Sequence, residues 1–177
     1  PRDNEALGGA DIHAKNGVLH DEPATELEAF ARARAFLSYL PSSTKGRAAR
    51  TVNDDPVTRR DDQLLSIVPR DRRQAYSMRR ILQSVCDQGS VFEMGARWGR
   101  AVITAFARLD GRPVAVLASD PTFLGGSWTA DASDKARRFV QLADLFRLPV
   151  VHFVDNPGFM IGLEAEKAAT IRRGVDA

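Results

Sequence analysis

The sequence contains little of what would define several other classes of protein. Its 177 residues include a single cysteine, Cys86, so no disulfide can form within the chain and a reducing compartment is expected. No uncharged apolar run approaches the roughly 18 residues of a membrane helix, so no membrane partner is expected. The N-terminus, at Pro1, has no apolar signal segment and indicates a fragment or a processed piece. These absences favour the cytoplasm, or the mitochondrial matrix in a eukaryote.

Most motifs of side-chain chemistry are also missing. The chain has no phosphate loop ending in Gly-Lys-Ser/Thr, no three-glycine dinucleotide fingerprint, no Gly-x-Ser-x-Gly elbow and no zinc pattern. His13, His20 and His152 stand far apart, without neighbours at ligand spacing, so no metal site is predicted. His152 falls inside a predicted strand and is interpreted as a core histidine. Cys86 ends an amphipathic helix and is interpreted as an inert packing residue.

The chain carries only a small excess of one charge. Its 25 lysines and arginines oppose 23 aspartates and glutamates, which leaves a formal net charge of +2. The basic surplus lies in residues 46–80, including a basic run at 70–73, but aspartates interleave with the arginines there. This mixture favours a solvated or interfacial surface with salt bridges over nucleic-acid binding, so no nucleic-acid partner is predicted.

Hydrophobic periodicity predicts a chain of mixed helices and strands. Residues 1–22 contain several turn-forming pairs and are interpreted as irregular. Residues 41–73 are rich in proline, serine, glycine and aspartate and are interpreted as a linker. Helices are expected at 24–40, 74–86 and 132–146, and strands at 91–94, 101–109, 114–118 and 150–154.

Two of these helices have an apolar face that we expect to be buried. In the helix at 132–146, the face contains Ala136, Phe139, Val140, Ala143 and Phe146. In the helix at 24–40, the face is formed by Leu27, Phe30, Ala31, Arg34 and Ala35, with Leu37 and Leu40 beside them.

The most informative unit is a strand, a helix and a second strand. The strands at 114–118 and 150–154 are apolar, as expected for parallel strands covered on both faces. The helix between them makes a crossover that is right-handed in nearly all proteins. Ligands of such sheets bind at the carboxyl ends of the strands, which places a candidate site at loops 119–131 and 155–162.

Both loops contain residues that suit backbone recognition of a ligand. Gly125-Gly126 precedes a predicted helix, and glycines there allow close approach to backbone N–H groups that can hold negative charge. The alternative is a flexible loop with a tight turn. Asn156-Pro157-Gly158-Phe159 predicts a sharp turn after a strand, with Phe159 either facing a ligand or packed in the core.

At these loops the chain resembles the carboxyltransferase (β) subunits of biotin-dependent acyl-CoA carboxylases, especially the propionyl-CoA carboxylase β type. The resemblance extends along essentially the whole chain, through short motifs in family order. These motifs are Leu7-Gly8-Gly9-Ala10-Asp11-Ile12-His13, Gly17-Val18-Leu19-His20, Leu37-Ser38-Tyr39-Leu40-Pro41-Ser42, Ile67-Val68-Pro69, Ala107-Arg108-Leu109-Asp110-Gly111-Arg112-Pro113-Val114, Asp134-Lys135-Ala136-Arg137-Arg138-Phe139, Phe153-Val154-Asp155-Asn156-Pro157-Gly158-Phe159 and Ile171-Arg172-Arg173-Gly174.

The resemblance implies an α/β fold of the crotonase-like (ClpP/crotonase) type, built from ββα repeats. It implies that residues 1–44 end an N-terminal carboxyltransferase domain and that residues 45–73 form a linker. Residues 74–177 would then be the first part of an incomplete C-terminal domain. Paired halves from different protomers form the family's active site, so a homo-oligomer, from dimer to hexamer, is expected.

The resemblance also implies carboxyl transfer from carboxybiotin to the α carbon of a short acyl-CoA. The biotin would be carried by a separate biotin carboxyl carrier or biotin carboxylase subunit. Gly125 and Gly126 would form the backbone oxyanion loop, and the segment alone is expected to be inactive without the family's two other glycine segments. Trp128-Thr129 replace the family's usual Leu-Asp. The implied substrate- or biotin-binding residues are Leu124, Ser127, Asn156, Pro157, Gly158, Phe159 and Gly162.

Two other functions remain open from the residues. A crotonase-type acyl-CoA hydratase, isomerase or decarboxylase would need a carboxylate as acid or base, and Glu164 and Glu166 are the nearby candidates. A non-catalytic assembly module would instead use the helix at 24–40 and the arginine-rich linker as interfaces.

Overall fold

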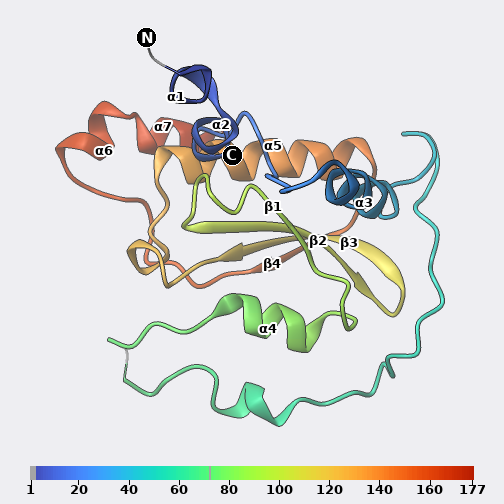
Figure 1. The fold of residues 1–177 in the computed structure, drawn as a ribbon. Helices are drawn as coiled ribbons and strands as arrows, with labels where there is room; N and C mark the ends of the chain where they lie inside the picture. Colours follow the sequence, from blue (N-terminus) through green and yellow to red (C-terminus); the bar gives the residue numbers. More distant parts are fainter. Residues whose placement is uncertain (1–2, 72) are drawn as a thin grey trace.

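A four-stranded mixed sheet separates two helical layers in the computed structural model, which describes residues 3–71 and 73–177 (Figure 1). Arg72 of the basic run lies outside the described residues, as does Pro1. The strands lie in the order β1-β2-β3-β4, with β4 parallel to β3 and the other pairs antiparallel. The predicted strands are confirmed as β1 Phe92–Met94, β2 Val102–Leu109, β3 Arg112–Ser119 and β4 Val150–Phe153.

A two-residue turn joins β2 to β3. Asp110 and Gly111 both have positive φ, 53° and 71°, as the tight turns of two-residue hairpins require. The turn sets the register, in which Leu109 pairs with Arg112 and Val102 pairs with Ser119. The hairpin therefore delivers the end of β3 beside the start of β2.

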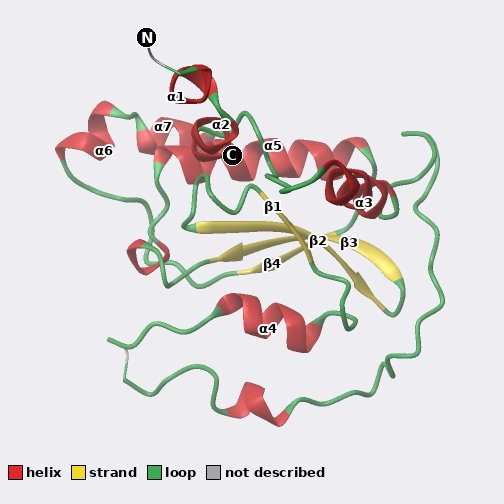
Figure 2. Ribbon diagram, viewed as in Figure 1, coloured by secondary structure: helices red, strands yellow, loops and turns green. Residues whose placement is uncertain are grey.

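The strands present alternate residues to the two helical layers. Ile103 and Ala105 of β2 pack with Leu82 of α4 (Met78–Val85), which lies below the sheet in Figure 2. Helix α4 begins later than the predicted 74–86. Cys86 ends it at 1% exposure, and burial raises the pKa of its thiol to about 11, which confirms that Cys86 is an inert packing residue.

The other face of the sheet is covered by α5 (Ala130–Leu145) and by α3 (Glu26–Leu37). Phe106 of β2 is fully buried there, with its ring centroid 5.5 Å from that of Phe139 and 5.7 Å from that of Tyr39. The predicted buried face of α5 is confirmed. The helix starts two residues earlier than expected because the hydroxyl of Thr129 accepts the N–H of Ala132 and caps it.

The buried face predicted for the helix at 24–40 is wrong for most of its residues, although Ala35 and Leu40 pack partly buried against the core. Leu27, Phe30 and Leu37 are 78%, 60% and 62% exposed, so the predicted apolar stripe faces outward in the described chain. Phe36 packs against the core instead, and the Arg32 guanidinium lies 4.0 Å from the centroid of the Phe92 ring. Contacts with aromatic rings of the sheet therefore determine which face of α3 turns toward the core, and the spacing of its aliphatic side chains does not.

Two further expectations are corrected at the ends of the chain. Residues 1–22 are not wholly irregular, because α1 (Asn4–Gly8) and α2 (Ala10–Lys15) form there, with Gly9 as the boundary between them. Strand β4 is not covered on both faces, and His152 is exposed rather than a core residue. In the described residues β4 is the edge of the sheet, where strands are incompletely covered.

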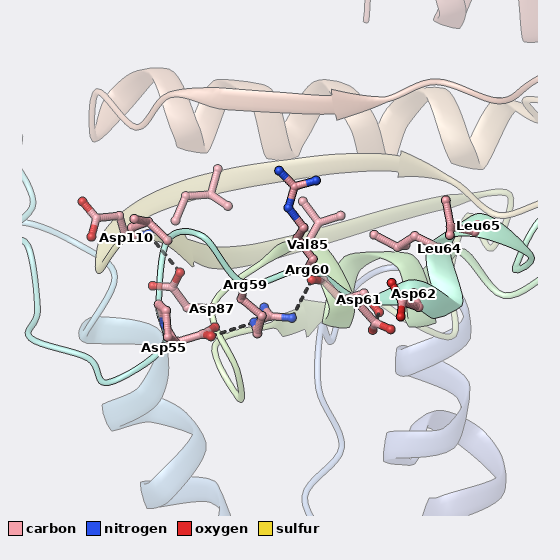
Figure 3. Close-up of a pocket in the computed structure, with 14 residues that line it drawn as sticks. Asp55, Arg59, Arg60, Asp61, Asp62, Leu64, Leu65, Val85, Asp87 and Asp110 are labelled. Carbon is pink, nitrogen blue, oxygen red and sulfur yellow. Dashed lines mark hydrogen bonds and ion pairs between the residues drawn. The ribbon is translucent and has the colours of Figure 1, made fainter.

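The segment between α3 and α4 is tied to the sheet near the β2–β3 turn. Arg59 donates to the carbonyls of Ser84 and Cys86, each at 2.7 Å, and to Asp55 at 2.6 Å. Its charge thereby meets the negative end of α4. A cavity of about 630 Å³ lies beside these contacts (Figure 3), but its acidic side chains are largely used in binding neighbouring protein groups.

The chain ends in two short helices, α6 (Leu163–Lys167) and α7 (Thr170–Val175). Helix α7 lies against α5, to which Arg173 is tied by an ion pair with Asp134. None of the helices in the described residues combines the length and the hydropathy that a bilayer crossing requires. The domain boundaries at 44/45 and 73/74 stay a prediction.

Lys135 of α5 is a buried cation with a consequence for stability. It is 3% exposed, and its Nζ donates to the carbonyl of Val102 at 2.6 Å. Burial lowers the pKa of Lys135 to about 8 from the usual 10.5, although nearby carboxylates oppose the shift. Between these two values the unfolded chain binds more protons than the folded one.

Lys135→Met should therefore remove a pH dependence of the unfolding free energy. The cost of the buried charge is fully present below about pH 8 and vanishes as the pH rises through about 10.5. The wild type should gain about 3 kcal/mol relative to the variant across this window. Chemical denaturation of both proteins from about pH 7.5 to 10.5 measures this gain. A difference that stays constant with pH would contradict it.

Candidate functional site at the carboxyl ends of β3 and β4

The two candidate loops lie side by side, as the strand–helix–strand unit predicts. The Asp155 N–H donates to the Ser119 hydroxyl at 3.1 Å and ties the ends of β3 and β4 together. Further along, the Trp128 N–H donates to the Gly158 carbonyl at 3.0 Å, and the Met160 N–H donates to the Trp128 carbonyl at 2.8 Å. The predicted parallel crossover β3–α5–β4 is therefore confirmed, and its loops form one continuous edge.

The glycine loop is a tight turn of consecutive left-handed residues. Leu124, Gly125 and Gly126 have φ values of 51°, 61° and 79°. The N–H groups of Gly126 and Ser127 donate to the carbonyls of Phe123 and Leu124, at 2.9 and 3.1 Å. Among the described residues, the N–H of Gly125 donates no hydrogen bond, and Gly125 is exposed. The loop therefore leaves the amide of Gly125 free to bind a ligand.

Gly126 is required by the neighbouring loop. A Cβ at this position would lie 2.9 Å from the Asp155 carbonyl oxygen, whereas a Cβ at Gly125 would meet no atom within 4 Å. The close approach of the two loop backbones, rather than contact with a ligand, therefore explains why residue 126 is a glycine.

A cavity of about 630 Å³ opens beside the exposed glycine. This volume lies within the range of small-molecule sites. Of the residues predicted for the site, the cavity is lined by Gly125, Asn156 and Pro157. The others lie outside its lining, and they are Leu124, Gly126, Ser127, Gly158, Phe159 and Gly162.

The third wall of this cavity was not predicted. It comes from Val68, Pro69 and Arg73 of the predicted linker, and from Gln74, Ala75 and Tyr76, which were expected to begin the helix at 74–86. The Tyr76 hydroxyl donates to the carboxylate of Asp155, which also lines the cavity. Burial, and then this hydrogen bond, raise the pKa of Tyr76, so the phenol stays protonated. One sequence signal for this wall was the Ile67-Val68-Pro69 motif of the family resemblance, because Val68 and Pro69 line the cavity.

Phe159 is in neither of its predicted environments, because it lies outside the cavity lining and outside the buried core. One edge of its ring meets Trp128, with ring centroids 6.3 Å apart and planes at 81°, and α7 approaches so closely that a Cβ on Gly174 would lie 2.2 Å from the ring. The rest of Phe159 leaves it 40% exposed. Trp128 therefore supports the second loop, which accounts structurally for the residue that replaces the usual leucine.

The charged side chains of the region do not form a metal site. Among the described residues, no group of three or more His, Cys, Asp or Glu side chains is arranged to hold a metal ion. Glu164 and Glu166 are exposed on α6, outside the cavity lining, and Glu164 pairs with Lys167 at 2.9 Å. The structure places at this candidate site the exposed backbone of Gly125 and the Tyr76–Asp155 pair, beside further polar side chains such as Asn156.

The fold and this sheet edge define an α/β protein of the crotonase-like class, as the sequence predicted. The carboxyl transferase domain family matches residues 2–176, and the chain belongs to this family. Its structure superimposes on that of transcarboxylase 12S, a hexamer determined with methylmalonyl-coenzyme A, with a TM-score of 0.92 and 34% identity. That match covers 97% of this chain and 34% of the transcarboxylase chain.

Curated relatives give the same family. A biotin-dependent long chain acyl-coenzyme A carboxylase beta4 subunit of Mycobacterium tuberculosis is 40% identical over 172 residues, which are 96% of this chain and 33% of that protein. A methylmalonyl-CoA decarboxylase subunit alpha of Veillonella parvula is 36% identical over 171 residues, which are 96% of this chain and 34% of that protein. The human mitochondrial propionyl-CoA carboxylase beta chain is 36% identical over 96% of this chain and 32% of that protein. The chain spans about a third of the length of the curated relatives it matches.

Alanine substitutions should separate the roles of the two glycines. Both positions have positive φ, so each alanine costs about 1–2 kcal/mol of unfolding free energy. Gly126→Ala adds a clash with the Asp155 carbonyl and should cost about 1–3 kcal/mol more than Gly125→Ala. Denaturant unfolding of the two variants measures the difference. Equal losses would contradict the close approach of the loops.

Proposed function

We propose that this protein transfers a carboxyl group between biotin and the α carbon of an acyl-CoA. The observation that carries the proposal is the unpaired amide of Gly125 at the wall of a cavity that no serine, cysteine or histidine of the described chain lines. Such a site suits a reaction in which negative charge develops on a ligand oxygen and no side-chain nucleophile is needed.

The chain's own residues supply binding and electrostatic stabilisation. The Gly125 N–H can donate to an oxygen on which charge develops, and one such donor typically lowers the barrier by about 3–4 kcal/mol. The Tyr76 hydroxyl donates a hydrogen bond to the Asp155 carboxylate, so this negative group does not stand unpaired in the cavity wall. Asn156 and Pro157, which follow Asp155 in the chain, also line the cavity. Biotin, when bound, would supply the carboxyl group.

A cavity of about 630 Å³ is large enough to hold the biotin ring. One relative is named a biotin-dependent long chain acyl-coenzyme A carboxylase subunit, and another is named a biotin-dependent acetyl-/propionyl-coenzyme A carboxylase subunit. These names support biotin delivered by a separate carrier protein as the partner. The hexameric assembly of transcarboxylase 12S supports a homo-oligomer. The roles of Gly125 and Gly126, and of the binding residues of both loops, are part of this proposal.

The acyl group is the finer part of the proposal. Among the relatives, one is named for long-chain acyl-CoA, one for acetyl- and propionyl-CoA, and one for propionyl-CoA. We keep the short acyl-CoA of the propionyl type as the substrate to be tested first. A biotin-independent hydratase or isomerase is less well supported, because Glu164 and Glu166 lie outside the cavity lining.

The test is an assay of the full-length protein with a biotinylated carrier and its biotin carboxylase. Acetyl-, propionyl-, butyryl- and long-chain acyl-CoA are supplied in turn, and carboxylated product is measured. We expect transfer that requires both the carrier and the acyl-CoA. A parallel arm supplies methylmalonyl-CoA and measures decarboxylation. Turnover of any acyl-CoA at the same rate without biotin would overturn the proposal.

The two tyrosines of the chain provide a matched pair of variants. Tyr76→Phe removes the partner of Asp155 and leaves an unpaired carboxylate at the cavity wall, so the transfer rate should fall about tenfold.

Tyr39→Phe is the control. It removes a hydrogen bond of 2.6 Å to the Ser90 carbonyl in the core, far from the cavity. It should lower the unfolding free energy by about 1–3 kcal/mol and leave the transfer rate of the folded protein unchanged. If both variants transfer equally fast, the Tyr76–Asp155 pair has no part in the site.

A further inference from the structure

Four charged side chains meet next to the glycine loop, and the proposed function does not use them. They come from four elements on both sides of the sheet, and we call them the Arg79 cluster. Its members are Arg79 of α4, Glu93 of β1, Asp120 at the end of β3 and Lys135 of α5.

Arg79 is the centre of the cluster. Its Nε and Nη2 atoms donate to both carboxylate oxygens of Glu93, at 2.8 and 2.7 Å. Its third nitrogen, Nη1, donates to Oδ2 of Asp120 at 2.5 Å. The planar fork of arginine suits this geometry, because it satisfies one carboxylate with two bonds and keeps a donor for a second. Arg79 therefore fixes Asp120 relative to β1.

Asp120 connects the cluster to the loop. Its N–H donates to the Ala101 carbonyl at 2.9 Å, and its Oδ1 accepts the N–H of Thr122 at 3.1 Å and also the Thr122 hydroxyl. Its carbonyl accepts the N–H of Phe123 at 3.1 Å, and the Phe123 carbonyl accepts the N–H of Gly126 at 2.9 Å. A continuous series of hydrogen bonds thus runs from Arg79 to the turn that exposes Gly125.

The cluster is costly to bury. Asp120 and Lys135 are both 3% exposed, and Lys135 has no carboxylate within bonding distance. Burial alone would raise the pKa of Asp120, but the hydrogen bonds from Thr122 and Arg79 hold it below its usual range. Apolar side chains of similar volume often stabilise a fold as well as buried ion pairs do. The geometry that these charges impose on residues 120–126 is therefore a better explanation for them than stability.

We propose that Asp120, held by Arg79, is the positioning residue for the Gly125 amide. The proposal rests on the carboxyl-transfer function, because Asp120 would fix the direction of the Gly125 N–H, which that function uses as a hydrogen-bond donor. The Gly125 N–H must point at an oxygen whose charge appears only in the transition state. A misdirected N–H therefore lowers kcat and leaves substrate binding almost unchanged. A displacement of about 1 Å can cost on the order of a hundredfold in rate.

Asp120→Asn is the main test, because its side-chain amide places N–H groups where Arg79 needs an acceptor. In the full-length protein with its biotinylated carrier, we expect kcat to fall about tenfold or more. KM for acyl-CoA should stay within about twofold of the wild type. Hydrogen exchange at the amides of Gly126 and Ser127 should accelerate, while exchange in β2 stays unchanged.

Asp110→Asn is the matched control. It makes the same change at the other end of β3, where Asp110 pairs with Arg50 at 2.5 Å on the surface. It should alter neither kcat nor the exchange of the glycine loop. Thr122→Val is a milder second variant, which removes one hydroxyl bond to Asp120 and keeps both ion pairs of Arg79. It should shift kcat and loop exchange in the same direction as Asp120→Asn, even if Asp120→Asn does not fold.

The outcomes separate the two proposals. Unchanged kcat and unchanged loop exchange in the folded variants overturn the positioning role. A proportional loss of kcat in Asp110→Asn also overturns it, because the effect is then not specific to the cluster. Faster loop exchange in a protein whose wild type transfers no carboxyl group overturns the proposed function and leaves the structural link between Asp120 and the loop supported.

Discussion

The parallel pairing of β3 with β4 across α5 is the constraint on which the rest of the structure depends. Parallel strands end at the same edge of a sheet, so the loops after Ser119 and Phe153 are brought together. Their backbones then approach so closely that Gly126 has no room for a side chain beside the Asp155 carbonyl. Gly126 is occupied in this contact, whereas the preceding residue, Gly125, lines the cavity, is exposed and donates no hydrogen bond from its N–H among the described residues.

The site gains its chemical character from backbone and supporting groups more than from reactive side chains. A free amide stabilises charge that develops in a transition state best when it is held rigidly, because a mobile donor would have to reorient during the reaction, as water molecules do. The hydrogen bonds from Asp120 through Phe123 supply that support, and the Tyr76–Asp155 pair holds the opposite wall. This arrangement accounts for a sequence that contains none of the usual nucleophile or metal motifs.

Local patterns predicted the elements well and their environments less well. The helix at 24–40 was recognised from the spacing of its apolar residues. Its rotation about its own axis, however, depends on the packing of the Phe36 ring against the Phe106 ring, with centroids 5.7 Å apart. These two residues lie far apart in the sequence. Strand β4 was recognised from its apolar run, but composition does not say which strand lies at a sheet edge. Residues 41–73 were interpreted as a linker because they are rich in proline, serine, glycine and aspartate, although Val68, Pro69 and Arg73 line the cavity.

By itself, the sequence determined the order of strands and helices, the parallel crossover, the two loops that form the site, and the resemblance to the carboxyltransferases. Each follows from short-range periodicity, from turn residues such as Asp110-Gly111, or from motifs in order. Only the tertiary structure decided which glycine keeps a free amide, that Tyr76 and Asp155 meet, and that Arg79 joins Asp120 to Glu93. Those facts depend on contacts between distant segments, and no local pattern contains the direction of a hydrogen bond between them.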